Sequence, residues 1–244
     1  MRNSWIRRTA IALGLFCSAA LGLTAFAKAP GAGFSDATTL AADIAFLQKG
    51  LAKDPQKREI PTLKAAALLV ALNAQNGKGD QSGIRDGALA VAEAISKKDY
   101  AKAKTLVAAL ADAKPTDKKA VGLVEVSKIG LEEVMSCFRK GTVGGLNLEA
   151  DVKAYGKAVG DVKAAGVAGG RIALIADYTL MLPPENTTGD KKAQWDKWSK
   201  EMGKLGSDVT TEVGKGDKAD KALLMKTFKA LEVNCNACHT VFRQ

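Results

Sequence analysis

The last ten residues of the chain bring together two cysteines and its only histidine. Cys235 and Cys238 are three positions apart, and His239 follows directly. Two thiols at this spacing lie on one helical turn, so each can add to one vinyl group of a porphyrin while the adjacent imidazole binds iron from the same side. The C-x-x-C-H pattern therefore predicts one covalently attached haem c, with His239 as an iron ligand.

Other chemistry for these residues also has to be considered. A structural zinc site could combine Cys137 with Cys235, Cys238 and His239, but two consecutive residues are awkward ligands for a tetrahedral metal. A disulfide between Cys235 and Cys238 is a further alternative, although it would be strained. A thioredoxin-like dithiol belongs at the start of a helix in an α/β unit, and no strand pattern is present. The spacing favours haem over these alternatives.

The residue counts exclude several classes of site. A single histidine excludes every site that needs two imidazoles from this chain, such as a bis-histidine haem. We find no Ser-His-Asp set, no phosphate-binding glycine loop and no second ionisable group expected beside the iron. The chain is therefore not expected to be an enzyme.

The N-terminus has the pattern of a secretory signal peptide, predicted to comprise residues 1–27. Three arginines precede an apolar run from Ile11 to Leu23, and Ala25-Phe26-Ala27 provides a small-x-small cleavage site. Cys17 lies within this run and is expected to be removed with it. The run is short for a membrane span, and no later stretch approaches about 20 apolar residues. We expect a periplasmic or otherwise exported protein, without a membrane span after signal removal.

Charge indicates the kind of partner. Removing Arg2, Arg7 and Arg8 with the signal peptide leaves 33 basic and 26 acidic residues, a net charge of +7. A positive surface attracts acidic partner surfaces. Nucleic acid is not expected as a partner, because no basic cluster is interleaved with aromatic residues.

The composition favours helices throughout. Hydrophobic residues make up 47% of the chain and aromatic residues only 5%, and alanine, leucine and lysine suit helices better than strands. Apolar residues recur every three or four positions, and no alternation with a period of two is found. Pro115 interrupts this pattern. We therefore predict an all-α protein of two tandem four-helix bundles, in residues 34–112 and 118–244.

Three helices of the second bundle matter for the site. The first is predicted to begin near Asp117, with Cys137 off its inward face. A second, long helix is expected from about Leu148 to Leu182, softened at Gly166 to Gly170. The inward stripe of the first helix is predicted to be Val121, Val124, Leu131, Met135 and Phe138, and that of the last helix Leu224, Phe228, Leu231, Cys235 and Cys238.

Residues 118–244 resemble the cytochrome c′ family of four-helix haem proteins. Family members end in C-x-x-C-H-x-x-[FY]-R, which here spans Cys235 to Arg243. A tryptophan that opens the third helix (Trp195) and a methionine on the first helix (Met135) also fit. Residues 34–112 contain no C-x-x-C-H and are at best a haemless copy.

The resemblance implies roles for individual residues. His239 is the proximal ligand of the iron, and the first helix of the bundle supplies the distal face. In the low-spin branch of the family a methionine sulfur occupies that face, and Met135 is the methionine on the matching helix. Arg243 offsets haem propionate or proximal charge, while Phe242 and Trp195 pack in the haem pocket. Family members also dimerise through their first two helices, so a homodimer is one expected assembly.

Three functions follow from these expectations. The first is one-electron transfer to a redox partner protein, with His/Met ligation of the iron. The second is binding of nitric oxide or carbon monoxide at a five-coordinate haem. The third is an interaction module, in which the haemless half docks a partner.

Overall fold

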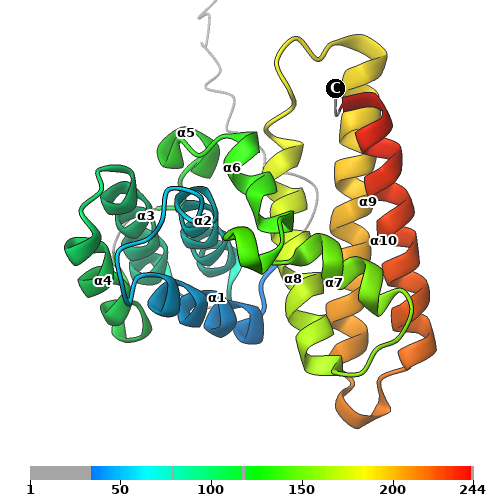
Figure 1. The fold of residues 1–244 in the computed structure, drawn as a ribbon, viewed down its shortest axis with the longest axis horizontal. Helices are drawn as coiled ribbons and strands as arrows, with labels where there is room; N and C mark the ends of the chain where they lie inside the picture. Colours follow the sequence, from blue (N-terminus) through cyan, green and yellow to red (C-terminus); the bar gives the residue numbers. More distant parts are fainter. Residues whose placement is uncertain (1–33, 79, 117–118, 243–244) are drawn as a thin grey trace, which may run out of the picture. The chain divides into compact units, whose positions relative to one another are not determined.

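The computed structural model describes residues 34–78, 80–116 and 119–242, and this part of the chain contains helices and no strand (Figure 1). The prediction of an all-α protein is confirmed. The predicted signal peptide (residues 1–27) and Arg243 lie outside the described residues. Within the described ranges, no helix is long and apolar enough to cross a membrane.

Four helices form an N-terminal set around α2. Helix α2 (Ile60–Asn76) contacts both α1 (Ala37–Gly50) and α3 (Ser82–Ser96), and α3 contacts α4 (Tyr100–Ala109). An almost unbroken run of alanine, leucine and valine lets neighbours approach α2 from every side, so all of its residues from 62 to 74 are buried, except the partly buried Lys64. Pro61 occupies the first turn, where its missing N–H costs no hydrogen bond. These helices agree with those predicted for residues 34–112.

The segment between the two sets differs from its prediction. The single helix expected after Asp117 was wrong: two short helices, α5 (Leu123–Ser127) and α6 (Leu131–Met135), are followed by 3-10 turns at Ser136–Phe138 and Gly141–Val143. Lys128 has a left-handed backbone with φ of 52° and ends α5. The inward stripe predicted for this segment, from Val121 to Phe138, is only half-buried as a result. The buried apolar residues of the segment are instead Leu123, Ile129, Val134 and Cys137.

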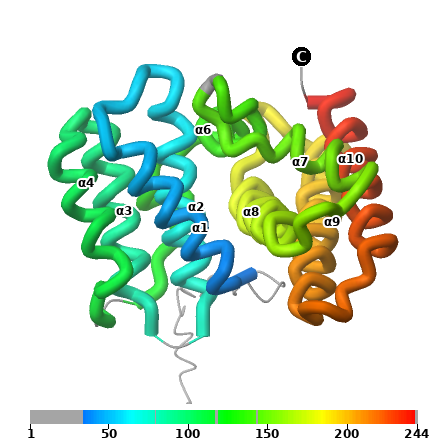
Figure 2. The backbone as a smooth tube through the Cα atoms, turned by 60° about the horizontal axis from the view of Figure 1, so that its bottom comes forward, coloured from blue at the N-terminus to red at the C-terminus, as the bar shows by residue number. Residues whose placement is uncertain are grey.

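Four further helices form a C-terminal set, in which α7 (Leu148–Tyr155) contacts α8 (Val162–Leu180), α8 contacts α9 (Gly189–Val213), α9 contacts α10 (Lys221–Phe242), and α10 returns to α7. Figure 2 shows α8, α9 and α10 side by side, with α7 crossing one side of the group against α8 and α10. The predicted continuous helix over 148–182 was wrong, because α7 ends at Tyr155. Asp161 starts α8 anew, its carboxylate accepting a hydrogen bond of 2.9 Å from the Ala164 N–H.

Glycines inside α8 serve close packing and do not interrupt the helix. A methyl group added at Gly166 would lie 2.8 Å from Cγ1 of Val213, and one at Gly169 would lie 2.5 Å from Cγ1 of Val209. Both valines belong to α9. The glycines therefore let α8 and α9 approach closely, and the predicted softening at Gly166 to Gly170 is replaced by an uninterrupted helix.

Candidate haem-attachment site

The C-x-x-C-H residues occupy the last turns of α10, where its apolar stripe reaches the surface. Leu224, Phe228 and Leu231 are fully buried, whereas Cys235 and Cys238 are half-buried and His239 is exposed. The predicted stripe is thus confirmed, with its burial decreasing toward the cysteines. The two half-buried cysteines and the exposed histidine therefore lie together on one helical segment.

The two thiols are free in the structure and favour their protonated form. Burial raises the pKa of Cys235 to about 11, and the neighbouring Cys238 thiol and the Glu149 and Glu232 carboxylates act in the same direction. Burial also raises the pKa of Cys238 to about 11.

Cys137 lies in a different environment. It is fully buried, close enough to Asp43 and Arg171 for both charges to act on its thiol, and its burial raises the thiol pKa strongly. Across residues 34–78, 80–116 and 119–242, no three histidine, cysteine, aspartate or glutamate side chains gather as metal ligands. The zinc set that joined Cys137 to Cys235 therefore receives no support. Its expected placement off the inward face is also wrong, because Cys137 is more buried than Met135.

Aromatic side chains fix the end of α10 against the start of α9. The Phe242 ring meets Trp195 edge-on with centroids 5.1 Å apart, and Trp198 at 5.9 Å. The Trp195 indole N–H donates to the Thr179 carbonyl at 2.8 Å, which ties this aromatic cluster to the last turn of α8. Two predicted pocket residues, Trp195 and Phe242, are therefore brought together one turn beyond His239.

A side-chain amide adds a second attachment on the other side of the cysteines. Asn234 directly precedes Cys235, and its Nδ2 donates to the Trp198 carbonyl at 3.0 Å. Both ends of the C-x-x-C-H segment are thus fastened to the first turns of α9. Sequence reasoning did not identify Asn234 or Trp198, because a lone asparagine on a helix has no distinctive spacing.

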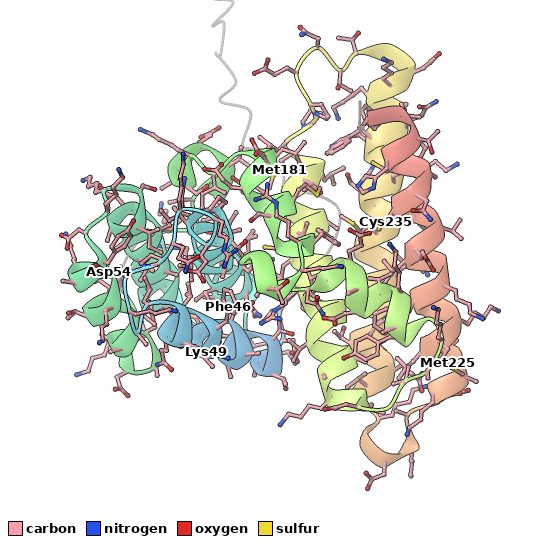
Figure 3. The ribbon with its side chains drawn as sticks, in the orientation of Figure 1. Phe46, Lys49, Asp54, Met181, Met225 and Cys235 are labelled. Carbon is pink, nitrogen blue, oxygen red and sulfur yellow. The ribbon has the colours of Figure 1, made fainter. Side chains whose placement is uncertain are left out.

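The methionines lie on separate elements. Met135 ends α6, whose main contacts are with α2, and is half-buried. Met181 directly follows α8 and is 51% exposed; Figure 3 places it and Cys235 in the half of the C-terminal set opposite Met225. Met202 is buried in α9. Met181 was not predicted as a site residue from the sequence. Its position shortly before Pro183-Pro184 indicated only the end of a helix.

The residues at the end of α10 fit a covalently bound haem. Two neighbouring cysteines are half-buried, an exposed histidine follows them, and the aromatic side chains of Trp195 and Phe242 lie at the same end of α10. Comparison of the chain with family models, curated proteins and solved structures finds no match. The assignment therefore depends on the chain's own residues.

Proposed function

We propose that this chain is an exported c-type cytochrome with one haem c, attached through Cys235 and Cys238, and that it transfers single electrons. The observation that carries the proposal is the C-x-x-C-H segment, with its half-buried thiols and exposed imidazole at the end of the stripe on α10. When bound, the haem supplies a one-electron redox couple whose potential depends on its axial ligands and burial.

The protein residues have distinct tasks in this proposal. Cys235 and Cys238 anchor the group, and His239 is the proximal ligand of the iron. Phe242 and Trp195 exclude water from one side, since their rings already contact each other. Arg243 offsets propionate charge, and the Met135 sulfur is the sixth ligand. The C-terminal set, α7 to α10, is proposed to be a four-helix bundle of the cytochrome c′ kind.

The cellular setting follows from the termini and the charge. Removal of residues 1–27 after export leaves a periplasmic chain. Covalent attachment of haem c also takes place outside the cytoplasm, which agrees with export. The surplus of basic residues suits a redox partner protein with an acidic docking surface. A second copy of the chain is the other proposed contact.

A five-coordinate haem that binds nitric oxide or carbon monoxide is the second candidate. One observation favours it: the main contacts of the Met135 helix are with α2 and not with α10. If the Met135 sulfur does not bind the iron, the distal face is open to small gases. Met135 therefore separates the two candidate functions.

The test is the spectrum of the mature protein, purified after periplasmic expression with haem-attachment machinery. We expect a haem that stays with the denatured polypeptide, and a low-spin ferric spectrum with a methionine–iron charge-transfer band. A high-spin ferric spectrum with rapid carbon monoxide binding after reduction would select the second candidate. A protein that acquires no covalent haem contradicts both.

A further inference from the structure

We infer a role for the haemless N-terminal set: α2 positions the turn that carries Met135, through Lys64 and Thr62. This inference depends on the proposed function, because it concerns the distal face of the proposed haem. Lys64 and Thr62 are positioning residues, acting through Glu133 and Ser136, which bracket Met135 in the sequence.

The first contact is an ion pair between α2 and α6. The Lys64 Nζ lies 2.5 Å from Oε1 of Glu133, with side-chain exposures of 15% and 28%. The other carboxylate oxygen of Glu133 accepts a hydrogen bond from the Gly130 N–H at 2.5 Å. Glu133 thus satisfies a free amide at the start of α6 while it is tied to α2, so the ion pair fixes this helix end on the N-terminal set.

The second contact lies just after Met135 and is fully buried. The hydroxyl oxygens of Thr62 and Ser136 are 2.9 Å apart, and both residues have no exposed surface. The Ser136 hydroxyl also donates to the Glu133 carbonyl at 2.5 Å. A buried hydroxyl that loses its partner is costly, so this contact holds the residue after Met135 in place.

Helix geometry determines the side on which Met135 lies. Glu133 and Ser136 are three residues apart and share the face of this segment that contacts α2. At about 100° per residue, Met135 lies about 200° from Glu133 around the axis, on the side away from α2. The C-terminal set contacts the same segment, since the Tyr178 hydroxyl on α8 donates to the Ile129 carbonyl at 2.7 Å.

The short length of α6 makes this support necessary. A five-residue helix has too few internal hydrogen bonds to be stable alone. Lys128 and Gly130 separate it from α5, so no long helix continues on either side to orient Met135. The two contacts with α2 provide the orientation that a continuous helix would have given.

The experiment compares variants of the full-length haem-loaded protein. In Lys64→Met and Thr62→Val we expect covalent haem to be retained and the fraction lacking the methionine–iron band to rise about tenfold, because a partly buried partner is removed. The band should also disappear at a lower temperature than the far-ultraviolet helix signal. Hydrogen exchange of residues 131–137 should accelerate, which measures the positioning without reference to the haem.

Two variants serve as controls. Lys97→Met removes an exposed ion pair of similar length, 2.6 Å to Glu93, elsewhere in the N-terminal set and should leave the band unchanged. Lys64→Arg keeps the charge and should restore most of the band, and Thr62→Ser, which keeps the hydroxyl, does the same for the second contact.

Each outcome has a defined meaning. Unchanged band and exchange in both Lys64→Met and Thr62→Val overturn the inference alone, as does an equal loss in Lys97→Met. Failure of the unmodified protein to acquire covalent haem overturns the proposed function. A high-spin unmodified protein overturns Met135 ligation and this inference together.

Discussion

The C-x-x-C-H turn and the Met135 turn are the two regions assigned to the iron, and they are built differently. The first ends a 22-residue helix, α10, and is fastened by Asn234 and Phe242 to α9 within its own helix set. The second belongs to the five-residue α6 and is fastened to α2, in the other set. One proposed iron ligand therefore has local support, whereas the other depends on residues about 70 positions earlier in the chain.

The largest effect is expected when both thiols of the first region are removed. In Cys235→Ser combined with Cys238→Ser we expect complete loss of covalent haem, because no other described cysteine lies on α10. Absorbance of the denatured, washed polypeptide measures it. Cys137→Ser is the matched control, since this buried cysteine lies beside Asp43 and Arg171. Loss of haem in that control alone would contradict the assignment.

Exchanging the methionines tests the second region. Met135→Leu keeps the volume and removes the sulfur, so we expect a change from a low-spin to a high-spin ferric spectrum and the appearance of rapid carbon monoxide binding after reduction. Met181→Leu is the control, because Met181 also lies toward the C-x-x-C-H end of its helix set. Loss of the band in Met181→Leu, with Met135→Leu unaffected, would show that the ligand is Met181, directly after α8.

A third contact between the helix sets predicts a pH effect on stability. Asp43 on α1 is fully buried, and its Oδ1 lies 2.7 Å from Nε of Arg171 on α8. Burial raises the pKa of Asp43 from 3.8 to about 6, although the charge of Arg171 and its hydrogen bond lower it. Between these values the folded protein binds more protons than the unfolded chain. The contribution of Asp43 to the free energy of unfolding therefore decreases as pH rises through this window, by on the order of 3 kcal/mol.

The measurement is chemical denaturation at a series of pH values from about 4 to 7, a range that covers both the unfolded and the folded pKa of this carboxyl group. In Asp43→Asn the group no longer titrates, so the unfolding free energy of the unmodified protein relative to that of the variant should decrease as pH rises through this range. The other carboxylates are common to both proteins and cancel in the difference. Parallel curves would show that Asp43 ionises normally in the folded state.

The smallest expected effect concerns the local support of the first region. Asn234→Ala removes the hydrogen bond to the Trp198 carbonyl and should lower the free energy of unfolding by about 1 kcal/mol. Thermal unfolding of the haem-loaded protein measures this. Thr240→Ala, which removes a hydroxyl that bonds only within α10 at 2.9 Å to the Asn236 carbonyl, is the control and should have less effect. Equal shifts would mean that the α9 attachment contributes little.

Sequence periodicity was sufficient to predict which side chains are buried where helices are long and pack against helices close to them in the chain. The stripe from Leu224 to Leu231 follows from its spacing alone. The apolar residues on either side of Met135 did not allow the same inference. This segment is held by contacts of Ser136 with Thr62 and of Glu133 with Lys64, which leave no trace in local periodicity.

Glycine was the residue whose meaning depended most on context. In the connecting segment Gly130 immediately precedes α6, as a helix-breaking residue should. In α8, Gly166 and Gly169 were expected to weaken a helix but are surrounded by α9 side chains. Composition alone cannot distinguish the two cases, because the difference lies in the partner helix.

The glycine contacts of α8 also constrain the packing of this helix. Because α9 is packed against Gly166 and Gly169, no side chain larger than hydrogen fits at these positions without moving a valine of α9. Arg171 and Thr179 are eight residues apart on this helix, about 12 Å along its axis. Helix α8 therefore links two tertiary contacts over this length: Arg171 pairs with Asp43 of α1, and the Thr179 carbonyl accepts the Trp195 indole N–H of α9.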